Sequence, residues 1–397
     1  MSPRVSVTEQ VLIAGAGPVG LVAAANLLRA GVPVTVLEAG SDLSTESRAS
    51  TFHPPTLDML DRLGAAQPLI AQGLKAPAFQ YRTKKHGLLA QFDFETIADA
   101  TAHPFRVQAE QSKLTRILLD QLRGRPGFEI RFNSKVKGLT QDAEGVAVTL
   151  EDRVETVTGQ WLIGADGASS NVRRALDIEF EGFTWPDRLL VVSTPFDFHS
   201  VIPDLTAVNY VADPDRWHFL LKIPGLWRVM FLIKENETDE QILTREFAQE
   251  LMKGVVPGIT HYEIAHTTLY KVHQRVAKTF RQGRAFLAGD AAHINNPLGG
   301  MGMNGGIHDA INLTDRLADV CKGGAPDTEL DRYDRQRRLV TMESIQIQTI
   351  QNKKNLESQG PEFRESLQKI KADPARTHDY LLRVSMIASL RRAQELG

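Results

Sequence analysis

Hydrophobic residues near the start of the chain form two apolar runs separated by a helical segment. The first run, 10–14, leads directly into the glycine-rich stretch 15–20, and strong helix formers follow at 21–30. The second run, 32–38, is rich in β-branched residues and ends in Glu38. This order predicts a βαβ unit, in which two parallel strands are joined by a right-handed helical crossover.

The pattern of apolar and polar residues up to residue 176 predicts further helices and strands of the same domain. Leucines at helical spacing predict a short helix over 51–64, and a second helix is predicted over 112–123. Three short alternating segments, FEIRF, VAVTL and VETVT, predict an antiparallel meander. A strand, a turn and a helix are predicted over 160–176.

The composition of the chain changes after residue 188. Four β-rich runs between 188 and 233, separated by Pro, Asp and Gly, predict the antiparallel sheet of a second domain, covered by a helix near 238–253. The first architecture resumes near residue 275, and the segment from about 327 onward is helical and charged. The first domain is therefore predicted to be discontinuous, with the β-rich domain inserted into it.

Composition and charge exclude several classes of partner. The 397 residues carry a net charge of −2 without a basic tail, which argues against nucleic acid. The single cysteine, Cys321, allows no intrachain disulfide and offers no metal-ligand spacing, as expected in a reducing cytoplasm. Glycine and proline interrupt the apolar stretch 11–28, so we expect no integral membrane segment. The preceding segment SPRVSVTEQ holds one arginine and one acid, so we expect no signal peptide either.

The glycines of the first stretch form a Gly-x-Gly-x-x-Gly motif between strand and helix. Gly15 allows a tight turn, Gly17 lets the backbone approach a pyrophosphate, and Gly20 lets the helix pack closely on the strand. Glu38 can accept hydrogen bonds from ribose hydroxyls. A plain glycine-rich turn is the alternative, but strand, helix and acid all stand where a dinucleotide site requires them.

A second glycine-rich stretch, FLAGDAAHINNPLGGMGMNGG, occupies residues 286–306. It contains another Gly-x-Gly-x-x-Gly, but no strand precedes that motif, so a second dinucleotide domain is not predicted. Asp290 follows a predicted strand and therefore lies at the sheet edge where α/β proteins bind ligands. The glycines then open a helix over about 302–317, whose N-terminus suits a planar, electron-accepting ring that carries a carbonyl group.

Three motifs in this order resemble the group A flavoprotein monooxygenases, the para-hydroxybenzoate hydroxylase family. They are GAGPVG…LE, the Asp-Gly-like GADGASSNVRR, and the Gly-Asp-like GRAFLAGDAAHINNPLGGMGMNGGIHDAINL. The resemblance spans about 10–320, and the segment ESRASTFHPPTLDMLDRLG is similar to the phenol-hydroxylating branch. The C-terminal helices are similar only loosely.

The resemblance implies the fold class and its division into domains. We expect an α/β protein with a Rossmann-like FAD-binding domain of the GR2 type, an inserted antiparallel β-sheet substrate domain and C-terminal helices. The expected segments are 1–75, 106–182 and 275–325 for the FAD-binding domain, 76–105 and 183–274 for the substrate domain, and 326–397 for the C-terminal helical region.

The resemblance also implies a tightly held FAD. Its expected contacts are Gly15, Gly17 and Gly20 at the pyrophosphate, Glu38 at the adenosine ribose, Arg48 at the phosphates, Gln111 at the flavin, Asp166 in a motif shared with the nicotinamide nucleotide, Asp290 at the ribityl chain, and the backbone N–H groups of Gly302, Met303 and Asn304 at the isoalloxazine. Arg48 could instead form a surface ion pair, and Gln111 could simply begin a helix.

The implied reaction is hydroxylation of a small phenolic or N-heteroaromatic substrate. NADH or NADPH reduces FAD, O₂ adds to give a flavin C4a-hydroperoxide, and its distal oxygen passes to the ring. A His or Tyr can deprotonate a phenolic substrate. In the β-rich insert, Tyr210, His218 and Arg228 are candidates to face a pocket, although each also fits the sheet surface or the core, and His293 is expected only to pack beside the flavin.

Two other kinds of function stay open. A related FAD-dependent reductase or oxidase would consume NAD(P)H without inserting oxygen. A halogenase is disfavoured because Trp217 and Trp227 lie ten residues apart and form no W-x-W-x-I-P motif. A non-catalytic flavin-binding module is the alternative from a different class. In each case we expect a cytoplasmic monomer or homodimer.

Overall fold

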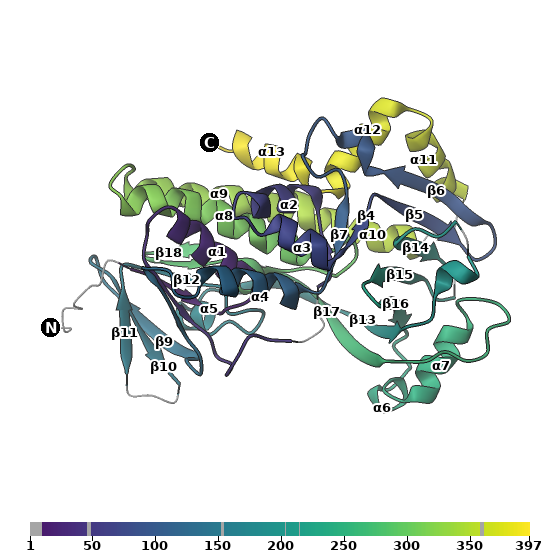
Figure 1. The fold of residues 1–397 in the computed structure, drawn as a ribbon, viewed down its shortest axis with the longest axis horizontal. Coiled ribbons are helices and arrows are strands. Elements are labelled where there is room, and N and C mark those ends of the chain that lie inside the picture. The colour runs from purple at the N-terminus through teal and green to yellow at the C-terminus, as the bar shows by residue number, and fades with distance from the viewer. Residues whose placement is uncertain (1–9, 46–48, 152–154, 203, 214, 358–360) are drawn as a thin grey trace.

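Two large β-sheets and a set of helices make up the chain in the computed structural model (Figure 1). The structure describes residues 10–45, 49–151, 155–202, 204–213, 215–357 and 361–397. The six-stranded sheet and its helices lie on the left in Figure 1, and the eight-stranded sheet lies on the right. Within the described residues, no helix is both long enough and apolar enough to cross a bilayer.

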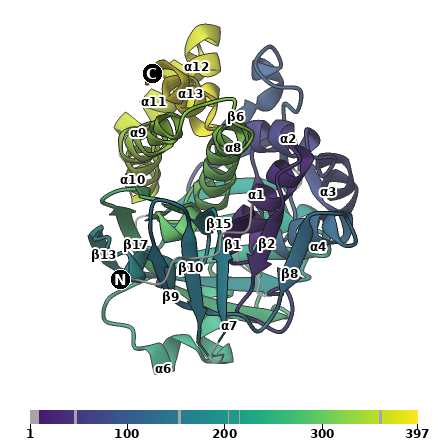
Figure 2. The same ribbon diagram turned by 90° about the vertical axis from the view of Figure 1, so that its left-hand side faces the viewer.

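The six-stranded sheet contains the predicted βαβ unit. Strand β1 (Val11–Ala14) pairs in parallel with β2 (Val34–Leu37), and helix α1 (Pro18–Arg29) connects them. On its other side β1 pairs in parallel with β12 (Trp161–Gly164), which pairs in parallel with β19 (Ala285–Leu287). The carboxyl ends of these strands therefore share one sheet edge. Figure 2 shows α1 and the long helix α8 beside this sheet.

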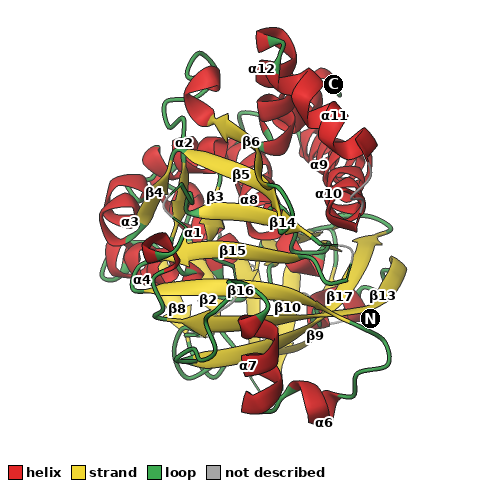
Figure 3. Cartoon of the chain, turned by 90° about the vertical axis from the view of Figure 1, so that its right-hand side faces the viewer, coloured by secondary structure: helices red, strands yellow, loops and turns green. Residues whose placement is uncertain are grey.

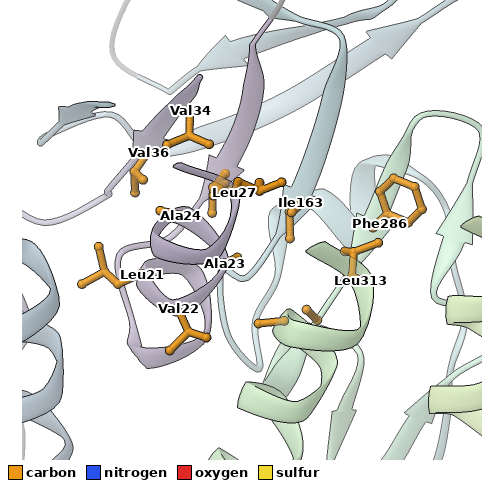
Figure 4. Packing of buried hydrophobic residues seen from close by; sticks show 14 of the residues in the cluster. Leu21, Val22, Ala23, Ala24, Leu27, Val34, Val36, Ile163, Phe286 and Leu313 are labelled. Atoms are coloured by element: carbon orange, nitrogen blue, oxygen red, sulfur yellow. The ribbon is translucent and has the colours of Figure 1, made fainter. Parts of the chain in front are cut away.

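The core of this body forms between the sheet and two helices (Figure 4). Leu21, Ala24 and Leu27 of α1 are fully buried with apolar side chains of the sheet. Helix α8 (Met301–Cys321) packs beside α1, and Asn26 Nδ2 donates to Thr314 Oγ1 at 2.9 Å across the contact. This packing fixes the N-terminus of each helix relative to the strand ends.

The predicted meander is wrong in one strand. FEIRF forms β8 (Phe128–Arg131), which pairs in parallel with β2 and is the edge strand of the six-stranded sheet. The meander consists of β9 (Val136–Gln141), β10 (Val146–Leu150) and β11 (Thr156–Gly159). An edge strand is covered on fewer sides than a central strand, so its sequence alternates just as an antiparallel strand does.

The β-rich region forms the predicted antiparallel sheet, which is larger than expected (Figure 3). Its order is β20-β17-β13-β16-β15-β14-β5-β6, and only β5 and β14 pair in parallel. The strands are β5 (Ala78–Thr83), β6 (Gly87–Asp93), β13 (Phe180–Thr194), β14 (Val208–Ala212), β15 (His218–Ile223), β16 (Leu226–Ile233), β17 (His266–Ala277) and β20 (His293–Ile294). Helices α6 (Asp239–Ile242) and α7 (Arg245–Lys253) follow β16, where one helix was predicted. The domain boundaries themselves stay a prediction.

A small three-stranded sheet and the C-terminal helices connect the two large sheets. The small sheet has the order β3-β7-β4 and lies near helices α2, α3 and α4. Its elements are β3 (Thr51–Phe52), α2 (Pro54–Asp61), α3 (Ala66–Gln72), β4 (Leu74–Ala76), β7 (Arg106–Gln108) and α4 (Gln111–Leu122). The C-terminal helices are α9 (Asp331–Val340), a π-helical turn (Thr341–Gln346), α10 (Ile347–Glu357), α11 (Pro361–Lys371), α12 (Pro374–Val384) and α13 (Ile387–Glu395). In Figure 1, α11 and α12 lie along the β5–β6 end of the eight-stranded sheet.

Candidate functional site

The turn between β1 and α1 has the shape of a phosphate cradle. Gly15 has φ +100°, and a Cβ there would lie 2.5 Å from the carbonyl oxygen of Ala165. A Cβ on Gly20 would lie 2.0 Å from the carbonyl oxygen of Gly15. A Cβ on Gly17 would meet no heavy atom within 4 Å, so that side of the turn is open. The first N–H groups of α1, which has no side-chain cap, face this space with the positive end of the helix dipole.

Glu38 brings a carboxylate to the same turn. Its Oε2 accepts from the backbone N–H of Ala16 at 2.6 Å, and its Oε1 accepts from Gly40 at 2.8 Å. Each carboxylate oxygen can accept more than one hydrogen bond, so Glu38 keeps acceptor capacity for ribose hydroxyls. The open turn and the adjacent acid together fit the adenosine diphosphate half of a dinucleotide.

The acid of the Asp-Gly motif, Asp166, stabilises the local backbone. Asp166 Oδ2 accepts from the backbone N–H groups of Asn171 (2.7 Å) and Val172 (3.1 Å), and its Oδ1 accepts from Ser170 Oγ at 2.5 Å. These bonds cap the start of the short helix α5 (Asn171–Ala175). Arg173, nearly buried, donates from Nη1 to the carbonyl of Ala291 at 2.8 Å and so joins this motif to the Gly-Asp motif.

Asp290 lies at the edge that the sequence predicts. It belongs to the 3-10 turn Gly289–Ala291 directly after β19, and its side chain is exposed. Because β1, β12 and β19 are parallel neighbours, Asp290 and the phosphate turn lie at one edge of the sheet. An exposed carboxylate there fits a chain of sugar-alcohol hydroxyls.

The glycine-rich loop before α8 is bare main chain in a left-handed conformation. Gly299 has φ +98° and Gly300 has φ +67°, and α8 begins at the next residue, Met301. A Cβ on Gly302 would meet only the Asn295 side chain, at 3.6 Å. The first N–H groups of a helix have no acceptor within it, so Met301, Gly302 and Met303 can present theirs to a ligand.

Two buried side chains hold this loop against β3. Asn304, fully buried, accepts from the N–H of His53 at 2.9 Å and donates to the carbonyls of Thr51 (2.8 Å) and Gly300 (2.6 Å). His53 Nε2 donates to the carbonyl of Gly299 at 2.8 Å. Burial and the neighbouring Arg106 cation hold the pKa of His53 well below its usual value, so this imidazole stays neutral. The sequence prediction missed His53.

A buried ionic cluster fixes the loop from the other side. Asp309 on α8 accepts from Arg337 Nε at 2.6 Å and from His293 Nε2 at 2.7 Å, and these three side chains are buried. The backbone N–H of Gly289 also donates to Asp309, at 3.1 Å. Burial by itself raises the pKa of Asp309, but His293 and Arg337 outweigh that effect and lower it. The cluster therefore carries an ionised carboxylate that ties the end of β19 to α8.

A small pocket adjoins the glycine-rich loop, and about 210 Å³ of space free of protein atoms lies in and in front of it, part of it open solvent. Gly299 and Met301 of this loop are among the residues that line the pocket. The other lining residues come from the eight-stranded sheet, β7 and the C-terminal helices: Phe79, Tyr81, Arg106, Tyr210, Asn352, Tyr380 and Val384. Aromatic rings on several sides suit a flat, apolar ligand.

Comparison with known proteins decides the family. A family model described as an FAD binding domain matches residues 8–348. The chain belongs to the group A flavin monooxygenases.

Two relatives of this flavin monooxygenase are named for substrates with a single aromatic ring. It is 36% identical over 342 residues to para-nitrophenol 4-monooxygenase of Pseudomonas sp. strain WBC-3, a match that covers 84% of each chain. It is also 36% identical to 6-hydroxy-3-succinoylpyridine 3-monooxygenase of Pseudomonas putida, over 90% of this chain and 91% of that one. The crystal structure of p-nitrophenol 4-monooxygenase from Pseudomonas putida DLL-E4 superposes with a TM-score of 0.88 at 32% identity, over 96% of this chain and 99% of that one.

This membership makes FAD the cofactor, and NAD(P)H and O₂ are the co-substrates typical of the family. The predicted family membership and the predicted FAD-binding α/β fold are confirmed. Which residues contact FAD stays a prediction. The open phosphate turn and the bare loop offer N–H donors, and Glu38 and Asp290 offer carboxylate acceptors, as FAD requires.

Three of the predicted cofactor residues stay predictions for which the structure adds separate information. Arg48 falls outside the described residues. Gln111 is half-buried at the first position of α4, and its backbone N–H donates to the carbonyl of Ala49 at 3.1 Å. The side chain of Asn304 is committed to the loop contacts described above, and by helix geometry its backbone N–H is the first that finds an acceptor within α8.

The three catalytic candidates of this monooxygenase separate in space. Tyr210 lines the pocket, with its ring stacked 5.2 Å from that of Tyr81. His218 and Arg228 are not among the residues that line this pocket. His218 is buried, and desolvation lowers its pKa to about 4, while Arg228 donates to Ser50 Oγ at 2.8 Å. Burial also lowers the pKa of Arg228.

Proposed function

We propose that this flavin monooxygenase hydroxylates a small phenol or hydroxypyridine bound in the aromatic pocket. The observation that supports the proposal is the shared wall: Gly299 and Met301 line the pocket and also belong to the loop expected to hold the isoalloxazine. A ring in the pocket would therefore lie against the flavin.

The names of the relatives support the same substrate class. One acts on para-nitrophenol and another on 6-hydroxy-3-succinoylpyridine, so both named substrates are single aromatic rings with a hydroxyl group. We assign to this chain a substrate of that kind, hydroxylated on the ring carbon that faces the flavin loop.

The residues of the chain have distinct roles in this proposal. Reduced FAD supplies the activation of O₂, which is chemistry that no side chain provides. Gly17 and Glu38 would hold the adenosine diphosphate part, Asp290 the ribityl chain, and the N–H groups of Met301 to Met303 the ring system. The pocket residues orient the substrate and exclude water, because water at the reacting centre leads to loss of the activated oxygen.

Two tyrosines supply neutral hydrogen-bond donors to the pocket. The hydroxyl groups of Tyr81 and Tyr380 lie 3.1 Å apart. Burial, with Tyr380 and Tyr210 nearby, raises the pKa of Tyr81 well above its usual value, and burial raises the pKa of Tyr380 to about 12. Both hydroxyls therefore stay protonated near neutral pH. One of them donates to the other, and the remaining O–H can donate to a substrate oxygen.

The test is oxygen incorporation under ¹⁸O₂. The FAD-loaded protein is incubated with NADH or NADPH and a panel of para-substituted phenols and hydroxypyridines, and the products are analysed by mass spectrometry. The proposal predicts one ¹⁸O atom per product and consumption of NAD(P)H that depends on the substrate. NAD(P)H consumption that yields only H₂O₂ and unaltered aromatic would assign a reductase or oxidase instead.

We also propose a cytoplasmic monomer or homodimer, since NAD(P)H is supplied in that compartment and a single, half-buried cysteine suits it. Light scattering on the FAD-loaded protein measures the assembly directly. A mass larger than two chains would overturn this part of the proposal.

A further inference from the structure

Arg106 is a buried cation beside the pocket with few partners of its own. It lies on β7, is 2% exposed, and lines the pocket. Among the described residues, its one hydrogen bond runs from Nη2 to the carbonyl of Val384 at 3.4 Å, and its Nε has no partner. No carboxylate of the described residues forms an ion pair with it. Most of its five N–H donors are therefore left without a protein acceptor.

Aromatic faces offset only part of the cost of burying this charge. The guanidinium carbon lies 4.9 Å from the ring centroid of Phe79 and 5.0 Å from that of Phe94. Such contacts stabilise a cation weakly compared with the cost of removing it from water, and buried charges are ordinarily paired with an opposite charge. A buried guanidinium without a paired carboxylate is suited to bind an anion that does not belong to the chain.

The rest of the pocket lining is uncharged. Its other polar groups are the side-chain amide of Asn352 and the hydroxyls of Tyr81, Tyr210 and Tyr380. Arg106 therefore gives the pocket one formal positive charge, surrounded by aromatic rings. A planar ring with one anionic oxygen matches both the shape and the charge.

We propose that Arg106 is a substrate-binding residue that selects an aromatic monoanion by holding an anionic oxygen attached to the ring. The oxygen belongs either to an ionised ring hydroxyl or to an acidic substituent, and the chemistry recognised is the same. This inference rests on the proposed function for its location, but it concerns binding and is tested by binding.

The experiment compares the wild-type holoenzyme with Arg106→Met and Arg106→Lys. Binding of 4-nitrophenol at pH 8, where it is a phenolate, is measured by calorimetry alongside nitrobenzene, which has the same ring and nitro group without the ionisable hydroxyl. Benzoate and benzamide form the second pair, which tests an acidic substituent. Arg82→Met is the matched control, because Arg82 is on β5, the strand that also carries Phe79, and pairs with Asp204 at 3.1 Å instead of lining the pocket.

Loss of a charge-assisted hydrogen bond predicts a Kd at least tenfold higher for the anion in Arg106→Met. The Kd of the neutral partner in each pair should change less than about twofold, Arg106→Lys should recover part of the loss, and Arg82→Met should bind as wild type. The pair that shows the loss identifies the oxygen. FAD content and thermal midpoint are measured for each variant, so that a misfolded protein is recognised before binding is compared.

Two results would overturn the inference. If Arg106→Met weakens anion and neutral ring equally, Arg106 is a structural partner of Phe79 and Phe94. If it weakens neither, the pocket does not use the charge. A wild-type protein that binds the anion through Arg106 and yet transfers no oxygen would refute the proposed hydroxylation and leave this inference standing.

Discussion

Replacing Gly17 with alanine separates cofactor binding from folding. Gly17 has φ −70° and ψ −179°, a conformation that alanine adopts freely, and an added Cβ meets no protein atom within 4 Å. Alanine lowers the entropy of the unfolded chain, which stabilises by about 0.4–1 kcal/mol, and it is a poorer N-cap than glycine by a similar amount. The free energy of unfolding of the apoprotein should therefore change by less than about 1 kcal/mol.

The same methyl group would occupy the open side of the turn, where the pyrophosphate must approach the backbone. Losing one charge-assisted hydrogen bond to a phosphate oxygen costs about 1.5–3 kcal/mol, which corresponds to a Kd for FAD that is about 10–150 times higher. Gly20→Ala is the contrast. Its Cβ would lie 2.0 Å from the carbonyl oxygen of Gly15, so that variant should lose about 1–3 kcal/mol of stability or more without any ligand.

Apoprotein of wild type and of both variants is prepared, and its unfolding in urea is measured. FAD is then titrated into each apoprotein, and binding is followed by flavin fluorescence. Gly17→Ala should unfold as wild type does and bind FAD weakly. A Gly17→Ala protein that binds FAD with wild-type affinity would show that the diphosphate lies elsewhere. An apoprotein destabilised as strongly as Gly20→Ala would show that the open side of the turn is filled in solution.

Three further predictions concern buried polar groups. His308, a buried residue of α8, contacts Thr56 Oγ1 through its Nε2 at 2.9 Å. Burial lowers the pKa of His218 to about 4 and that of His308 to about 3. The unfolded chain therefore binds protons first, so the free energy of unfolding is fully present above about pH 6.5 and falls as the pH drops below it. Each histidine should lower the free energy of unfolding by about 2 kcal/mol at pH 5. Urea unfolding midpoints at pH 7 and pH 5 measure this loss. If His308→Asn loses as much stability between these pH values as wild type does, the prediction for His308 is wrong. Asp309→Asn leaves Arg337 buried without its anion and should lower the free energy of unfolding by about 3–5 kcal/mol. The double variant Asp309→Asn/Arg337→Met should lose less, because it leaves no unpaired buried charge. Equal losses in the two variants would show that the pair is not coupled. Asn304→Ala removes three hydrogen bonds at about 1 kcal/mol each and should speed FAD release in stopped-flow, whereas wild-type release would mean that the loop is held by other contacts.

The parts of the fold that depend on local sequence could be predicted. The βαβ unit follows from apolar runs, helix formers and glycines that are neighbours in the chain, and the structure has it at 11–37. The partner of a strand is a different matter. FEIRF alternates in the same way whether it joins a meander or the edge of a parallel sheet, and only the tertiary structure pairs Val34 with Phe128.

In the candidate site, too, residues that are close in sequence could be predicted, and residues brought together from distant segments could not. Gly15, Gly17 and Gly20 stand in a recognisable spacing, but Tyr81 and Tyr380 are 299 residues apart and nothing in either neighbourhood indicates that their hydroxyls meet. Arg106 had one local signal, a single cation between Phe105 and Val107 in a short apolar run. That signal becomes informative only when the structure shows that no carboxylate of the described residues pairs with it.

The most direct measurement is a crystal structure of the protein with FAD and 4-nitrophenol bound. We expect the isoalloxazine along the main chain of 299–303, the diphosphate at the start of α1, and the phenol ring in the aromatic pocket with an oxygen on Arg106. Flavin density away from the glycine loop, or a phenol bound on a surface that does not touch Gly299 and Met301, would contradict it.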